Sequence, residues 1–101
     1  MIILFGVLIF GLLAISAHAQ SGTVTGNYCG STYGNHNGTF AFRVGSTERD
    51  FEVSFSSTKM IRFEPGSIRV GDEFVIKYRG NSAKTITGTG RRRRVTPCNM
   101  D

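Results

Sequence analysis

The chain has 101 residues, of which 40% are hydrophobic, and 12 Lys and Arg outweigh 7 Asp and Glu to give a formal net charge of +5. This length supports one small domain and excludes a multidomain architecture. The two cysteines and His36, the one histidine after residue 19, do not supply the four ligands of a zinc site, and we expect no metal or cofactor.

Residues 1–19 have the features of a secretory signal peptide. The segment Ile2–Ile15 is almost uninterrupted in its apolar character, and Ala17 and Ala19 are the small residues of a cleavage pattern. The apolar run is short for a bilayer core of ~30 Å. We therefore predict cleavage after Ala19 and a secreted or periplasmic protein with no membrane span after cleavage. Because no Lys or Arg precedes the apolar run, an uncleaved anchor is the alternative.

Five segments after the signal peptide alternate apolar and polar side chains, which is the pattern of half-buried antiparallel strands. In chain order they are Thr23–Cys29, Thr39–Val44, Phe51–Phe55, Glu73–Arg79 and Ala83–Thr87. Segments rich in Gly, Asn and Pro separate them, and no helix is expected. Met60–Phe63 is a candidate for a further short strand.

This pattern predicts an all-β domain over residues 20–101, either a small barrel or a sandwich, with a basic tail over residues 91–101. The inward positions of the strands are mostly aromatic or branched, and burying a Phe stabilises a domain by about 1.5–3 kcal/mol. The predicted core is Val24, Tyr28, Phe40, Phe42, Val44, Phe51, Val53, Phe55, Ile68, Phe74, Ile76, Tyr78 and Ile86.

Cys29 and Cys98 lie near the two ends of the predicted domain. In an oxidising compartment, an even number of cysteines favours a disulfide over free thiols. Closing a loop of about 70 residues would stabilise the domain by about 4 kcal/mol in the chain-entropy model. A redox-active pair, the alternative, more often has Cys-x-x-Cys spacing.

The second half of the chain carries a pattern found in a known group of domains. The segment Phe63–Tyr78 is followed by the turn Gly80-Asn81 and by a last strand that begins Ala83–Ile86. Together with the hairpin Gly38–Phe55, this pattern resembles the OB-fold-like domains of exported bacterial proteins, over roughly residues 22–89. Many of these domains have no assigned activity, so the resemblance concerns the fold more than the function.

The resemblance implies a five-stranded antiparallel OB-like barrel. It places the loop Gly30–Gly38, which holds Tyr33 and His36, on the binding face, where an aromatic ring can stack on a base or a sugar. Packing of Tyr33 on the rim and a solvated His36 are the alternative. The first and last strands of such a barrel are parallel and end at the same rim. A Cys29–Cys98 bridge would then fold residues 91–96 across that rim.

Arg91, Arg92, Arg93 and Arg94, here called the arginine run, are the sharpest feature after the signal peptide. Guanidinium groups bind phosphate, sulfate or carboxylate through paired hydrogen bonds, so the run is a candidate anion-binding site. Arg43, Arg79 and Lys84 would extend it if the barrel forms. A solvated, mutually repelling segment and a proteolytic processing site are the alternatives.

The sequence offers no catalytic residues. His36 cannot act with a bridged Cys29, and Asp72 and Glu73 are adjacent on a strand, so they point to opposite faces. We expect a non-enzymatic binding module for an acidic polysaccharide, a lipid phosphate or an acidic protein; nucleic acid is not expected outside the cell. A structural component of the cell envelope that pairs with another protein through a sheet edge is the alternative. The oligomeric state stays open.

Overall fold

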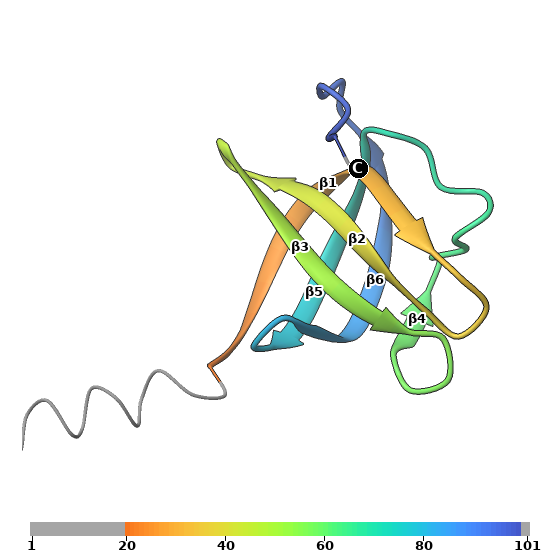
Figure 1. Cartoon of the computed structure of the whole chain (residues 1–101). Helices are drawn as coiled ribbons and strands as arrows, with labels where there is room; N and C mark the ends of the chain where they lie inside the picture. Colours follow the sequence, from red (N-terminus) through yellow and green to blue (C-terminus); the bar gives the residue numbers. More distant parts are fainter. Residues whose placement is uncertain (1–19, 100–101) are drawn as a thin grey trace, which may run out of the picture.

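The structure is a computed structural model that describes residues 20–99 (Figure 1). The predicted signal peptide and its cleavage site lie outside the described residues. Residues 20–99 contain strands and no helix, so the all-β prediction is confirmed. The six strands form one sheet. They are β1 (Ser21–Tyr33), β2 (Asn37–Val44), β3 (Thr47–Ser54), β4 (Lys59–Ile61), β5 (Asp72–Arg79) and β6 (Ser82–Arg92).

β1 is the longest strand and has different neighbours along its two halves. Ser21–Asn27 pairs antiparallel with β5, and the segment from Asn27 to Tyr33, apart from Cys29, pairs antiparallel with β2. The register shifts by one residue between Tyr28 and Gly30, which leaves Cys29 as the extra residue of a β-bulge. Because a bulge bends a strand and increases its twist, β1 can turn from one neighbour to the other.

The strand order is β3-β2-β1-β5-β6-β4, and β3 additionally pairs with β6 at Glu52 and Ser82. The pairings of β6 with β3 and with β4 are both parallel. The sheet therefore differs from the predicted set of five antiparallel strands in having a sixth strand and two parallel contacts. Parallel neighbours need a long connection: residues 55–81 connect β3 to β6, and residues 62–81, which include β5, connect β4 to β6.

Two strands extend further than the alternating pattern predicted. β1 continues past Cys29 to Tyr33 because Ser31, Thr32 and Tyr33 pair with the start of β2. β6 continues past Thr87 to Arg92, whose partner in the register is Asp72. Part of the predicted loop and part of the predicted tail are thus strand, since backbone pairing holds polar segments as readily as apolar ones.

The core is aromatic and agrees with most of the predicted positions. The predicted positions that are buried are Tyr28, Phe40, Phe42, Phe51, Val53, Phe74, Ile76 and Ile86. Val24, Val44, Phe55, Ile68 and Tyr78 are partly buried and pack against this cluster. Phe63, which is 4% exposed, and Ala83 belong to the core but were missing from the prediction. The Phe63 ring lies 5.2 Å from the ring centres of both Phe40 and Phe74.

Candidate functional site

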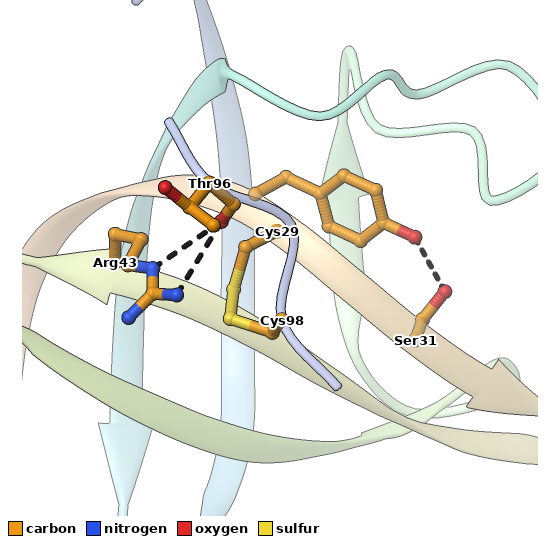
Figure 2. The surroundings of a disulfide bond; sticks show 6 residues. Cys29, Ser31, Arg43, Thr96 and Cys98 are labelled. Carbon is orange, nitrogen blue, oxygen red and sulfur yellow. Dashed lines mark hydrogen bonds between the residues drawn. A yellow bond between two sulfur atoms is a disulfide. The ribbon is translucent and has the colours of Figure 1, made fainter. Parts of the chain in front are cut away.

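A disulfide joins Cys29 to Cys98, as predicted, and their Cα atoms are 5.0 Å apart (Figure 2). Cys29, the extra residue of the bulge in β1, is only 1% exposed. The backbone N–H of Cys98 also donates a hydrogen bond of 2.8 Å to the carbonyl oxygen of Cys29. The expectation that Cys29 ends its strand is wrong: the bridge joins the end of the chain to the middle of β1.

Residues 93–99, here called the tail, are held to the sheet at two further points. The N–H of Arg93 donates to the carbonyl oxygen of Gly71 at 2.9 Å. Figure 2 shows the guanidinium of Arg43 reaching the carbonyl oxygen of Thr96, with both N···O distances at 3.4 Å. The tail therefore crosses over β1, at Cys29, and over β2, at Arg43.

Gly71 is the residue on which these contacts converge. Its carbonyl oxygen also accepts a buried hydrogen bond from the side-chain amide of Asn27, and its N–H donates to Tyr28. Its φ is +103°, and a Cβ here would collide with the carbonyl oxygen of Arg93. Only glycine allows this close approach of the tail to the turn before β5.

The arginine run begins in β6 and ends in the tail, and all four of its side chains are exposed. The Nε of Arg92 lies 2.9 Å from Oδ1 of Asp72. This is the single ion pair within residues 20–99, so Arg91, Arg93 and Arg94 have no carboxylate partner in that part of the chain. One arginine of the run is therefore held and neutralised by a carboxylate, and the other three keep an uncompensated charge within these residues.

The pKa of Asp72 lies below its ordinary value. Partial burial acts to raise it, but the hydrogen bonds from the backbone N–H of Arg69 and from the side chain of Arg92, together with both positive charges, outweigh that effect. Asp72 is thus a carboxylate that fixes the direction of Arg92.

Of the three cations expected to extend the arginine run, Arg43 contacts the tail, at the carbonyl oxygen of Thr96, two residues past the run. Arg79 pairs with Ser82 in the register of β5 and β6, whereas Arg92 pairs with Asp72 at the other end of the same two strands. Arg79 and the neighbouring Lys84 therefore lie at the far end of the sheet, and that part of the expectation is wrong.

Tyr33 and His36 lie at the turn between β1 and β2, apart from the arginine run. Tyr33 is 48% exposed, yet its ring stacks on Phe40 at 5.4 Å and its hydroxyl donates to the carbonyl oxygen of Pro65 at 3.3 Å. It lines a shallow pocket with residues of β2 and β3, including Thr39 and Glu52. The His36 side chain is exposed and does not line this pocket. The Tyr33 ring thus packs on the aromatic core and also forms part of the edge of this pocket.

A second pocket, of about 570 Å³, lies beside the arginine run and was not predicted. Arg91 and Arg92 line it together with Arg62, which follows β4 and is 29 positions earlier in the chain than Arg91. A lone arginine between two apolar residues gives no signal in the sequence, and only the crossover of β4 onto β6 brings Arg62 to this place.

Residues 20–99 contain no group of three or more side chains suited to a metal ion. The same part of the chain holds no helix long and apolar enough to cross a membrane. No protein family model, curated protein or solved structure matches the chain. The resemblance to OB-fold-like domains therefore stays a prediction.

Proposed function

We propose that this chain is an exported, non-enzymatic binding module for anionic partners, with the arginine run as its binding surface. The observation that carries this proposal is the anchoring of the run, by the hydrogen bond between Arg93 and Gly71 and by the bridge from Cys98 to Cys29. An anchored segment loses less conformational entropy on binding than a free tail, so more of the attraction is left as affinity.

The fold that we propose for the module is an OB-like barrel. What supports it is the set of pairings, because β1, β2, β3, β6 and β5 form a closed cycle of neighbours. A five-stranded Greek-key barrel of the OB type is partly open. The one residue pair between β3 and β6 is consistent with such a weak closure.

The expected partners are acidic polysaccharides, lipid phosphates or acidic protein surfaces, met outside the cytosol. The disulfide and the predicted signal peptide are compatible with a secreted or periplasmic location. Exposed guanidinium groups bind such anions with paired hydrogen bonds, and the surplus of positive charge speeds the encounter.

Retention on immobilised heparin and on vesicles containing phosphatidic acid, measured across a salt gradient, tests the proposal. Replacing each arginine of the run with glutamine changes the net charge from +5 to +1 (5 − 4). We expect this variant to elute near the void volume at low salt, because the charge-assisted contacts are gone.

The matched control removes four exposed cations from the opposite end of the sheet. These are Lys59, Lys77, Arg79 and Lys84, which lie in or beside the Ser82–Thr85 part of β6; replacing them with glutamine also gives +1. We expect this control to keep most of its retention. Equal losses in the two variants would mean that total charge and not the anchored run causes binding.

A second candidate function is a structural protein of the cell envelope that binds a partner strand. What favours it is the edge of β3, where residues Thr47–Phe51 have no paired strand on the side opposite β2 within residues 20–99. Three charged residues, Glu48, Arg49 and Asp50, lie on this edge and act against strand addition. A partner held through backbone pairing should stay bound at high salt, whereas a partner of the arginine run should not.

A further inference from the structure

The pocket beside the arginine run brings together arginines from two distant segments. Arg62 comes from the crossover connection after β4, and Arg91 and Arg92 come from the end of β6. Ile68 and Phe74 line the same pocket, so part of its wall is apolar. We refer to this pocket as the arginine groove.

Arg62 holds an unusual backbone conformation. Its φ is +54°, the one positive value among non-glycine residues in the described part of the chain. The turn lets Phe63 enter the core while the carbonyl of Arg62 lies against Gly88 of β6, where a Cβ would come within 2.5 Å of that oxygen. Glycine or asparagine would adopt this turn at lower cost. Strain of this kind is often kept where the side chain serves a function.

The groove also contains three carboxylates, which limit what it can bind. Asp72 is neutralised by Arg92, and Oε1 of Glu73 accepts a hydrogen bond of 2.8 Å from the hydroxyl of Thr89. Glu64 lines the groove as well. These negative charges would repel a densely charged polymer lying along the groove, so they favour a ligand with one compact anionic group.

We propose that Arg62 and Arg91 bind a single tetrahedral oxyanion, a phosphate or sulfate group, in the arginine groove, with Arg92 held beside them by Asp72. This inference rests on the proposed function and assigns one specific site and its ligand chemistry to part of the same surface. The oxyanion could come from a phospholipid head group or from a phosphorylated or sulfated sugar, and the wall formed by Ile68 and Phe74 would contact the uncharged part of either.

Titration of the ¹⁵N-labelled, disulfide-bonded protein, purified from an exporting host, tests the inference. The backbone amides of Gly88 and Gly90, which line the groove, should shift and saturate with inorganic phosphate and with inorganic sulfate. Dihexanoyl phosphatidic acid below its micellar concentration and glucose 6-sulfate then distinguish a lipid source from a sugar source. The tighter of the two identifies the class of ligand.

The decisive variant is Arg62→Gly, because it separates binding from folding. We expect the affinity for phosphate to fall about fivefold or more as an exposed charge pair is lost. We expect the melting temperature to rise by about 3 °C, because glycine adopts the left-handed turn without strain. Arg62→Gln, which keeps the long side chain, should show the same loss of affinity. Arg79→Gln, with the same change of charge at the opposite end of β5 and β6, should leave the affinity within twofold.

The outcomes separate this inference from the proposed function. Unchanged affinity in both Arg62 variants, or an equal loss in Arg79→Gln, overturns the groove while heparin retention can still depend on the run. Heparin retention that survives replacement of the whole run overturns the proposed function itself. Absence of any saturable shift with phosphate and sulfate in the wild type also rejects the groove.

Discussion

Asp72 contacts the arginine run with one carboxylate oxygen and the turn before β5 with the other. Oδ1 accepts from the Nε of Arg92, and Oδ2 accepts from the backbone N–H of Arg69, each at 2.9 Å. These contacts need the ionised carboxylate, so its depressed pKa is a contribution to the stability of the fold.

The pH dependence of melting should therefore carry a signature of Asp72. A depressed pKa stabilises the fold at every pH above the ordinary aspartate value of about 3.9, and the stabilisation is lost as the pH falls through the lower value of the folded protein. We expect Asp72→Asn to melt below the wild type at pH 6 and the difference to shrink towards pH 2. Calorimetric scans over this range check it, with the exposed Asp50→Asn as the control of equal charge change. A difference that does not vary with pH contradicts the assignment.

At the scale of the elements, the turn before β5 determines how β1, β5 and the tail meet. Gly71 donates to β1, accepts from Asn27 and from Arg93, and sits where a side chain would displace the tail. A change at this one turn should therefore disturb three segments at once.

We expect Gly71→Ala to lower the free energy of unfolding by about 2–4 kcal/mol, through left-handed strain together with the collision with the Arg93 carbonyl. Gly45→Ala is the matched control, because Gly45 also has a positive φ, +64°, but faces open space. That variant should lose about 1 kcal/mol. Urea denaturation of both proteins measures the difference, and equal losses would mean that the tail does not press on Gly71.

The alternation of apolar residues was enough to predict the five long strands and most of the core, since residues such as Phe40, Phe42 and Ile76 repeat with a period of two. Phe63 escaped because it lies in a connection with no period, and its burial depends on the left-handed turn at Arg62. The continuation of β1 to Tyr33 escaped because it depends on pairing with β2 around a bulge. The candidate site shows the same difference between local and long-range signals. The arginine run is visible in the sequence, whereas the arginine groove forms only because the chain brings Arg62 beside β6.

At the scale of the whole molecule, the bridge between Cys29 and Cys98 closes the described domain over a separation of 69 residues. In the chain-entropy model, a loop of this size restricts the unfolded chain and stabilises the fold by about 4 kcal/mol. The effect acts on the unfolded state and is therefore independent of the local contacts of the tail.

Cys98→Ser should accordingly lower the melting temperature by about 10 °C or more. Cys29→Ser should lower the melting temperature further. The serine hydroxyl would take a position that is 1% exposed, and burying it there costs its hydration. Thermal scans of the wild type with and without reductant provide the comparison without mutation. Identical melting in the two conditions would show that the bridge does not form in the isolated protein.

The position of Cys98 beyond the arginine run has a topological consequence. Hydrolysis of any peptide bond from Arg94 to Cys98 would leave two polypeptides that still share one sulfur–sulfur bond. A trypsin-like protease could thus create a new carboxylate beside the arginines without releasing the severed fragment. Electrophoresis under reducing conditions would separate the two pieces. Under non-reducing conditions the mass of the linked protein would increase by one water molecule.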